Sequence, residues 1–456
     1  MNKIFAIAAI TVRSAIRSRV VLVLLGLLLF AIVSLPLTVE GDGTPGGYVR
    51  VFLTYTLGAV SLILSLATLW AGCAAVADEI AERQLQMVVT KPVSLFHVWL
   101  GKWAGLMALN VFLLAVSGVV VGALLYWNID RSDLSEADRE TLRAQVLLSL
   151  RPHLPALPDI EAEAQARLPE VKASLGPDAT VSDRELLRQV RLMLKRRAFT
   201  VAPNTTVSFR FSLPDQLPAN QPLYLDYQFA ASDPTPTLVP HRWRVRRAEG
   251  DRFAELRTEV MSGLRHRVDL DPAPLAGQGP VIVEFRNSFD GPVSVLFEPD
   301  DGLILYTYAG GFAGNLVRAL LIQLMQLGLL AAVGVTAGSL FSLPVAAFVS
   351  LFVILMLATA PYVRGLAERE VFVAITEEPS LAARAVDAAL AYSFQLMYQT
   401  LAPLRDMQPF EDLSVGRHVP WSGVVRVFSI RILLYSGLIG FLGSLLFMRR
   451  EIGAAS

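Results

Sequence analysis

The sequence predicts an α-helical integral membrane protein with six transmembrane helices and an inserted extracytoplasmic α+β domain, in which helices precede a β-sandwich. Hydrophobic residues make up 54% of the 456 positions, which is more than soluble domains use on average. The charges are unevenly spread, because residues 128–311 hold 22 of the 40 basic and 26 of the 40 acidic side chains. That stretch is therefore expected to be a water-soluble domain inserted into a membrane chain.

The overall charge and the cysteine content exclude several kinds of site. The formal net charge is zero, so nothing indicates a nucleic-acid partner. The single cysteine, Cys73, lies inside an apolar run. One cysteine cannot form a disulfide or a cysteine-built metal site within the chain, and a buried, inert thiol is expected.

The first 19 residues form an amphipathic stretch. Arg13 and Arg17 share one helical face, and isoleucine and phenylalanine supply an apolar surface. This pattern predicts a helix over residues 1–19 that lies at the membrane interface, with its basic side toward anionic headgroups. A signal peptide is the alternative, but the basic region is long for one and no A-x-A-like cleavage site follows.

Six apolar runs are long enough to cross a bilayer, which takes about 20 apolar residues in a helix. We expect spans at 20–38, 51–77, 103–127, about 316–340, about 343–363 and roughly 427–448. The membrane part thus divides into residues 20–127, 312–363 and 426–456, the last including a cytoplasmic tail. Phe341 to Pro344 is the expected hinge between the fourth and fifth spans.

An even number of spans places both termini on one side of the membrane. Cytoplasmic loops are enriched in Lys and Arg. The basic residues near the termini and in the loop after the second span are Lys3, Arg13, Arg17, Arg19, Lys91, Lys102, Arg449 and Arg450. Both termini and residues 78–102 are therefore expected in the cytoplasm. The predicted location is a bacterial cytoplasmic (inner) membrane, with 128–311 and 364–425 outside.

The inserted segment has two parts. Residues 132–199 show apolar residues at helical spacing, including Leu147 and Leu150, and are expected to be helical. Residues 205–310 show short alternating runs separated by turns, which predicts a β-sandwich. The expected strands are 206–212, 222–229, 242–247, 254–260, 265–270, 280–287, 292–298 and 303–308. The segment is either a platform for an extracytoplasmic partner or a passive domain.

Another helix is expected at residues 381–404, inside the outer loop 364–425. It is apolar on much of its surface but is interrupted by Arg384 and Asp387. It either dips into the outer leaflet or covers a pore mouth, or it packs beneath the inserted domain.

The segment 78–102 is charged and lies between two runs without Asp, Glu, Lys or Arg. It combines acidic residues, Glu-Arg, Gln-Leu, Thr-Lys-Pro-Val-Ser and Leu-Gly-Lys. Glu79 and Arg83 stand in the favourable order for an i, i+4 ion pair. Pro92 ends the first helix and Ser94 is a candidate N-cap of the next. This pattern resembles the first cytoplasmic loop of ABC-2-type transporter permeases, and an ordinary amphipathic loop is the alternative.

The resemblance implies a coupling helix that docks on a separate ATPase subunit. The residues in matching positions are Glu79, Glu82, Arg83, Thr90, Lys91, Pro92, Gly101 and Lys102. The expected partners are a cytoplasmic P-loop ATPase dimer, a second permease subunit (in a homodimer or a heterodimer) and the lipid bilayer. An extracytoplasmic partner of 128–311 is also considered. The ATPase would bind ATP and Mg, and no cofactor is expected in this chain.

The chain lacks several motifs of enzymes and ion-coupled carriers. It contains no G-x-x-x-x-G-K-[ST] sequence, so no P-loop, and no H-E-x-x-H or G-x-S-x-G motif. An enzyme is therefore not expected. The central parts of the spans contain no Asp or Glu, which a coupling ion would need. Arg318 and Arg431 are interpreted as lying near outer ends of spans, where their side chains can snorkel.

Polar residues inside the spans are candidates for a translocation path. They are Ser61, Ser65, Thr68, Asn110, Gln323 and Gln326. Hydrogen bonding between helices is the alternative for each of them. Spaced glycines such as Gly118 with Gly122, and Gly334 with Gly338, permit close helix packing within a subunit or across a dimer.

The sequence thus favours a membrane-spanning permease subunit of an ATP-driven ABC exporter that exports or extracts an unknown substrate. The insert between the third and fourth spans departs from many members of the family. A membrane-anchored scaffold or sensor, which uses 128–311 to bind a partner without transport, is the alternative. An ion-coupled carrier is a third candidate.

Overall fold

The computed structural model describes residues 3–38, 45–82, 94–131, 147–157, 159–175, 183–213, 221–233, 235, 237–250, 252–275, 277–299, 301–367, 381–405 and 409–448. The chain forms two compact units. One unit comprises residues 1–149 and 310–456, and the other comprises residues 150–309. We call them the membrane unit and the inserted unit.

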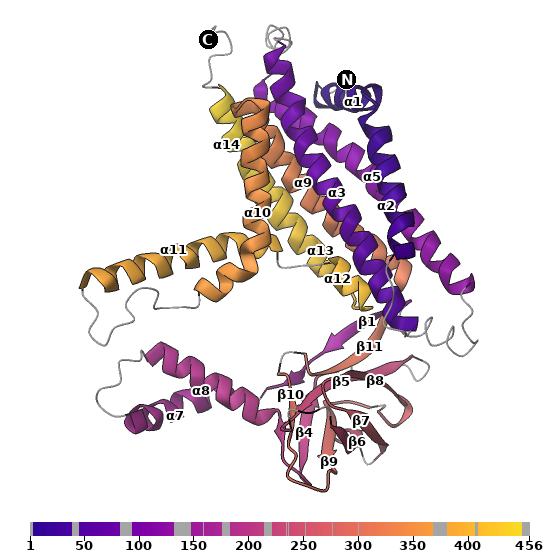
Figure 1. Ribbon diagram of the computed structural model, residues 1–456, viewed down its shortest axis with the longest axis vertical. Helices are drawn as coiled ribbons and strands as arrows, with labels where there is room; N and C mark the ends of the chain where they lie inside the picture. The colour runs from indigo at the N-terminus through magenta and orange to yellow at the C-terminus, as the bar shows by residue number, and fades with distance from the viewer. Residues whose placement is uncertain are drawn as a thin grey trace. The chain divides into compact units, whose positions relative to one another are not determined.

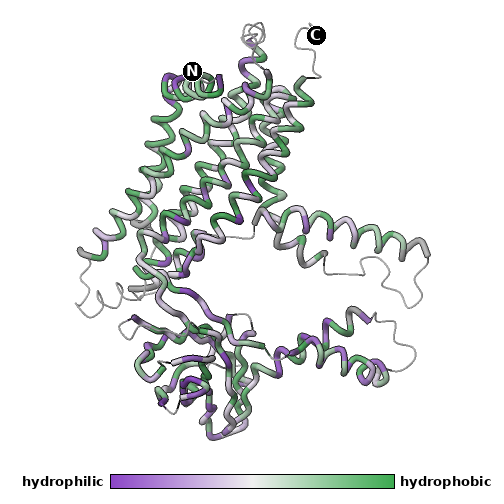
Figure 2. The backbone as a smooth tube through the Cα atoms, turned by 180° about the vertical axis from the view of Figure 1, so that it is seen from behind, coloured by the Kyte–Doolittle hydropathy of each residue, from purple (hydrophilic) through white to green (hydrophobic). Residues whose placement is uncertain are grey.

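The membrane unit is a bundle of helices (Figure 1). Its described helices are α1 (Lys3–Arg17), α2 (Val20–Thr38), α3 (Pro45–Ala81), α5 (Leu95–Arg131), α9 (Phe312–Leu340), α10 (Leu343–Ala367), α11 (Leu381–Arg405), α12 (Pro409–Ser414), α13 (Trp421–Val427), the π-helical segment η2 (Phe428–Ser436) and α14 (Gly437–Met448). Figure 2 shows that apolar residues cover most of the bundle helices, whereas polar residues are frequent in the inserted unit. The protein is thus a multi-pass membrane protein with an inserted β-rich domain.

Four of the described helices are long and apolar enough to cross a membrane: Gly47–Ala81, Leu95–Ile129, Phe312–Leu340 and Trp421–Met448. Five spans result if α1 and Val20–Leu35 count as one bent span. This range is smaller than the six expected spans. The difference arises because Leu343–Thr359 of α10 is a shorter apolar stretch and α2 qualifies only together with α1.

The N-terminal helix α1 turns away from α2 by 66° (Figure 1). Arg19 adopts a φ of 61° at the bend, a left-handed conformation that is uncommon outside glycine. Two glycines of α5 allow α1 to pack closely against it. A Cβ atom on Gly101 would lie 2.6 Å from Ile7 Cβ, and one on Gly105 would lie 2.7 Å from Thr11 Cβ. The helix expected at 1–19 is therefore present and packs closely on α5.

Glycines also bring α3 and α9 into backbone contact. A Cβ atom on Gly334 would lie 2.8 Å from the Leu69 carbonyl oxygen and 3.1 Å from Gly72 Cα, and one on Gly338 would collide with the Cys73 backbone. Gly118 likewise faces the side chain of Leu320. The spaced glycines of the sequence therefore act between helices of one subunit. Cys73 is buried, as expected.

The inserted unit contains two sheets. The first has the order β1-β11-β5-β10-β3, with β8 also paired to β5, and the second has the order β2-β4-β9-β6-β7. The strands are β1 (Leu148–His153), β2 (Pro155–Ala156), β3 (Thr200–Val201), β4 (Thr206–Phe211), β5 (Leu223–Ala231), β6 (Leu238–Arg247), β7 (Phe253–Met261), β8 (Arg265–Leu270), β9 (Val281–Asn287), β10 (Val295–Phe297) and β11 (Leu303–Gly311). Each of the eight expected strands has a counterpart among β4 to β11.

An aromatic core joins the two sheets. Tyr227 and Phe229 project from β5, whereas Trp243 and Phe285 project from β6 and β9. The ring centroids of Tyr227 and Trp243 are 5.0 Å apart, and those of Trp243 and Phe285 are 4.7 Å apart. Aromatic pairs at these distances add to the stabilisation that their burial supplies. The sheets therefore pack face to face through one continuous core.

The helical prediction for residues 132–199 was wrong in part. Helices α7 (Ile160–Leu175) and α8 (Asp183–Ala198) are present, but Leu148–His153 and Pro155–Ala156 are strands. Leu150 is fully buried in β1. A strand forms because pairing with β11 outweighs the local helical spacing of the leucines. Residues 132–146 lie outside the described part of the chain.

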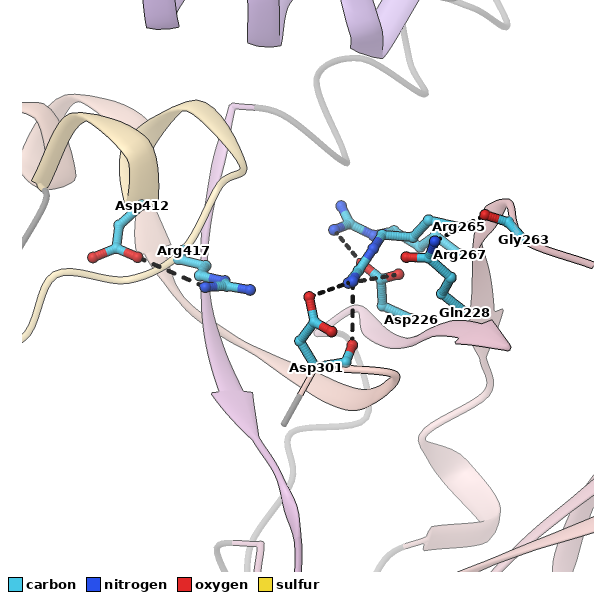
Figure 3. A network of polar contacts seen from close by, with 8 residues as sticks. All are labelled: Asp226, Gln228, Gly263, Arg265, Arg267, Asp301, Asp412 and Arg417. Atoms are coloured by element: carbon cyan, nitrogen blue, oxygen red, sulfur yellow. Dashed lines mark hydrogen bonds and ion pairs between the residues drawn. The ribbon is translucent and has the colours of Figure 1, made fainter. Parts of the chain in front are cut away.

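A charged network holds one edge of the first sheet (Figure 3). Asp226 on β5 is buried and lies 3.0 Å from Arg267 and 3.7 Å from Arg265 on the neighbouring β8. Arg265 also pairs with Asp301 at 2.8 Å. A buried carboxylate needs such partners, because burying an unpaired charge is costly. These arginines therefore act within the inserted unit.

Candidate functional site

The candidate site is a cavity of about 740 Å³ within the membrane unit. Residues of α3, α9, α10, α12 and η2 line it. Four of the six predicted path residues are among them: Ser61 and Ser65 on α3, and Gln323 and Gln326 on α9. The structure therefore brings together residues that lie more than 250 positions apart in the sequence.

Helix α3 presents one stripe of side chains to the cavity. Its lining residues, which share one side of the helix, are Arg50, Val51, Thr54, Tyr55, Gly58, Ser61, Leu62 and Ser65. The stripe mixes small, hydroxyl and apolar groups, and Leu62 is 60% exposed. From Arg50 to Ser65 the helix advances about 22 Å at 1.5 Å per residue. The cavity is therefore elongated along α3.

Helix α9 supplies two amides to the same cavity. Gln323 and Gln326 are three positions apart and so share one side of the helix. Gln323 is 5% exposed, and its Nε2 has no hydrogen-bond partner among the described residues. A buried amide without a partner costs free energy. Gln323 thus offers a buried donor beside the cavity.

The surroundings of Arg431 differ from those expected. This residue is 3% exposed, lines the cavity and belongs to the π-helical segment η2. Its neighbour Ile432 packs on α9, where a Cβ atom on Gly328 would lie 2.6 Å from Ile432 Cδ1. The side chain of Arg431 is therefore buried in the bundle and does not extend to the surface, as a snorkelling side chain would. Segments of π-helix are rare and often occur at functional sites.

Two further charged residues, Arg50 and Glu411, line the cavity, and both are exposed. Arg318, which was interpreted together with Arg431 as a snorkelling arginine, is not among the lining residues. Arg318 donates toward the Asn315 side-chain oxygen at 3.4 Å, lies 3.3 Å from His418 Nδ1 and stacks over Trp421. It therefore also has partners inside the protein. The charged side chains among the described lining residues of the cavity are Arg50, Arg431 and Glu411, thus two arginines and one glutamate.

The short helix α12 closes one part of the cavity with Phe410 and Ser414. The loop after α12 is tied to α9, because Asn315 donates to the Arg417 carbonyl at 2.7 Å and accepts from the Val419 amide at 2.8 Å. Asp412 of α12 lies 3.9 Å from Arg417 (Figure 3). Burial raises the pKa of Asp412, and Arg417 opposes this rise.

Thr68 and Asn110 do not line this cavity. Thr68 Oγ1 donates to Asn110 Oδ1 at 2.9 Å, and both side chains are buried between α3 and α5. For this pair the structure matches the alternative of a hydrogen bond between helices.

The coupling segment is described at its two ends. Glu79, in the last turns of α3, pairs with Lys102, in the second turn of α5. The side chain of Lys102 is 7% exposed and that of Glu79 is 29% exposed. Ser94 caps α5, since its Oγ accepts from the His97 amide at 3.4 Å. Glu82 is exposed. Four residues of the coupling segment lie outside the described residues: Arg83, Thr90, Lys91 and Pro92. The expected ion pair between Glu79 and Arg83 therefore also falls outside the described part of the chain.

The first turns of α5 are bonded to other helices. Trp99 Nε1 donates to Thr336 Oγ1 at 3.0 Å, and Trp103 Nε1 donates to the Gly328 carbonyl at 2.8 Å. The two indoles stack with their centroids 6.4 Å apart. The ring of Trp99 also packs on Gly440 of α14. Together with the α1 contact at Gly101, these bonds join the base of the coupling segment to three helices.

Sequence reasoning missed Arg431, Arg50, Tyr55 and Glu411 as cavity residues. An arginine interrupting the apolar run 427–448 was a visible signal, since ionisable residues within spans usually face the bundle interior. No protein-family model, no curated protein and no solved structure matches this chain.

Proposed function

We propose that this chain is the membrane-spanning permease subunit of an ATP-driven ABC exporter in a bacterial cytoplasmic membrane. Two permease subunits and two cytoplasmic ATPase subunits form the working complex. The chain crosses the membrane six times, with both termini in the cytoplasm and the inserted β-sandwich outside. In this topology α10 is the fifth span and α2 the first.

One observation carries the proposal: the base of the charged segment 78–102 is bonded to the rest of the bundle. The Glu79–Lys102 pair closes the hairpin between α3 and α5. Trp99 and Trp103 extend its contacts to α9 and α14. A push on this segment by a docked ATPase would therefore move several helices together, as packed helices shift as rigid elements.

The cavity supports the second half of the proposal. It is lined by α3, whose last turns carry Glu79, and by α9, to which Trp99 and Trp103 donate. The mechanical input and the candidate path thus share two helices. We propose that movement of the coupling segment changes the width of the cavity between α3, α9 and α10.

The test is co-purification of the full chain with its ATPase in detergent, followed by an ATPase assay. Reversal of both charges, Glu82→Arg with Arg83→Glu, is expected to abolish association and stimulation. The matched control reverses an exposed ion pair of the inserted unit, Glu163→Arg with Arg167→Glu, whose atoms lie 2.7 Å apart. The control is expected to leave association unchanged.

Unchanged association in the Glu82 and Arg83 variant, or no ATPase ever co-purifying, would favour a membrane-anchored scaffold that uses its inserted unit to bind a partner. Transport that follows a proton gradient without ATP would favour an ion-coupled carrier instead.

A further inference from the structure

The strongest unexplained feature of the cavity is the buried arginine in its wall. An ionisable side chain within a span is costly and usually marks a substrate or ion pathway. Arg431 is 3% exposed and lines the cavity. It also sits in the nine-residue π-helical segment η2, which disrupts the regular helix of the span at this point.

A second polar group faces the same space. Gln323 Nε2 is buried and has no hydrogen-bond partner among the described residues, and Gln326 lines the cavity one turn further along. Arginine and amide N–H groups are donors that suit a carboxylate or phosphate, and an arginine can bind either in bidentate fashion. Arg431 and the two amides thus supply hydrogen-bond donors to the wall of the cavity.

The remainder of the wall is largely apolar. Leu62 of α3, Leu330 of α9, and Ile354 and Leu357 of α10 line the cavity. The lining of α3 extends over about 22 Å, which is longer than a compact ion needs. An elongated, largely apolar slot with a buried arginine in its wall matches a ligand that has an acidic head and a hydrocarbon chain.

We propose that the cavity binds an anionic amphiphile, with its carboxylate or phosphate head at Arg431 and Gln323 and its chain against Leu62, Ile354 and Leu357. A cationic head is disfavoured, because two arginines and one glutamate are the charged lining residues. The assignment names the substrate class of the proposed exporter and in that sense rests on it. Binding itself requires no ATPase, so the two proposals fail separately.

The test uses the purified full chain in nanodiscs of zwitterionic phosphatidylcholine. The probes are photoreactive alkyl chains of one length that carry a phosphate, a carboxylate or a trimethylammonium head. Crosslinked peptides are identified by mass spectrometry, and affinity is measured by titration. We expect the two anionic probes to label α3 and α10 around Leu62 and Ile354, and the cationic probe to label them much less.

The variant Arg431→Gln is expected to weaken the binding of the anionic probes at least tenfold, which corresponds to about 1.4 kcal/mol of binding free energy. Arg431→Lys should keep most of the affinity, since it keeps the charge. Gln323→Leu should weaken binding less than Arg431→Gln. The matched control is Arg426→Gln, an exposed arginine of the same span that does not line the cavity. Thermal unfolding of each variant shows whether it is folded.

Two further arms separate the sources of the ligand. If an anionic lipid co-purifies with the wild type and is lost in Arg431→Gln, the natural ligand is a membrane lipid. If the added anionic probe binds but no lipid co-purifies, the natural ligand is a soluble amphiphile. Equal labelling by anionic and cationic probes, or equal affinity of the wild type and a folded Arg431→Gln, would overturn the proposal.

Discussion

The two units of this protein exclude solvent from their interiors in opposite ways. In the membrane unit, α3 and α9 meet through Gly72, Gly334 and Gly338, so that backbone lies against backbone. In the inserted unit, the sheets meet through large rings such as Trp243 and Phe285, which are fully buried.

The difference follows from the two solvents. In water the burial of apolar area drives packing, and aromatic side chains bury the most area per residue. In a bilayer the lipid tails are as apolar as the side chains, so helices associate through close van der Waals contact, which small residues allow. The same chain therefore uses its largest residues in one core and its smallest in the other.

The largest effect is expected where the aromatic core is emptied. Trp243→Ala should destabilise the inserted unit by about 4 kcal/mol, because it removes a buried side chain and leaves a cavity. Hydrogen exchange should become faster in residues 150–309, while the helices of the membrane unit keep their protection. Trp243→Phe is the control and should cost much less. Equal loss of protection in both units would contradict their separate cores.

The second-largest effect is expected from acid, which should destabilise the inserted unit. His241 is buried, and its Nε2 lies 3.0 Å from the Tyr227 hydroxyl. Burial lowers the pKa of His241 to about 4. The unfolded chain titrates near 6.5, so the stabilisation is complete above pH 6.5 and is lost as the pH falls toward 4.

The expected loss is about 3 kcal/mol between these two pH values, at 1.36 kcal/mol per pKa unit. Hydrogen exchange of residues 150–309 against pH measures it. His241→Gln keeps an acceptor for Tyr227 but does not titrate, so its profile should be flatter. A wild-type profile as flat as that of the variant would show that His241 does not control the acid sensitivity. Burial also lowers the pKa of His153, which the variant leaves in place.

A smaller effect is expected where the glycine contact is overfilled. Gly338→Val should destabilise the α3–α9 pair by about 2 kcal/mol, because the new side chain meets the Cys73 backbone, which cannot rotate away. Thermal unfolding in detergent is the measurement. Gly26→Val on α2 is the control, since nothing lies within 4 Å of its Cβ position. Similar melting temperatures of the two variants would argue against a tight α3–α9 contact.

The smallest effect is expected from the polar bond within the bundle. Thr68→Val removes the hydrogen bond to Asn110 and should cost roughly 0.6 kcal/mol, the average measured for such bonds between membrane helices. Thr359→Val, which removes a hydroxyl bonded to its own helix at Met356, serves as control. A loss above about 2 kcal/mol would mean that Thr68 has a role beyond this bond.

The sequence predicted the regular elements well where one local pattern dominates. The strands β4 to β11 follow from alternation and turns, and α9, α11 and the break at Phe341 follow from apolar runs and helix-breaking residues. It predicted β1 wrongly, because leucines at helical spacing say nothing about the distant β11 with which they pair. Four path residues were predicted on the cavity, whereas Thr68 and Asn110 bond to each other.

The sequence by itself determined that the chain is a membrane protein with a β-rich insertion, because composition and periodicity are local and survive without any knowledge of contacts. Only the tertiary structure decided that Lys102 pairs with Glu79, that α1 packs on Gly101 and that Arg431 lines a cavity. Each of these depends on which helix lies beside which. That choice is made by packing between segments far apart in the chain, and no single stretch encodes it.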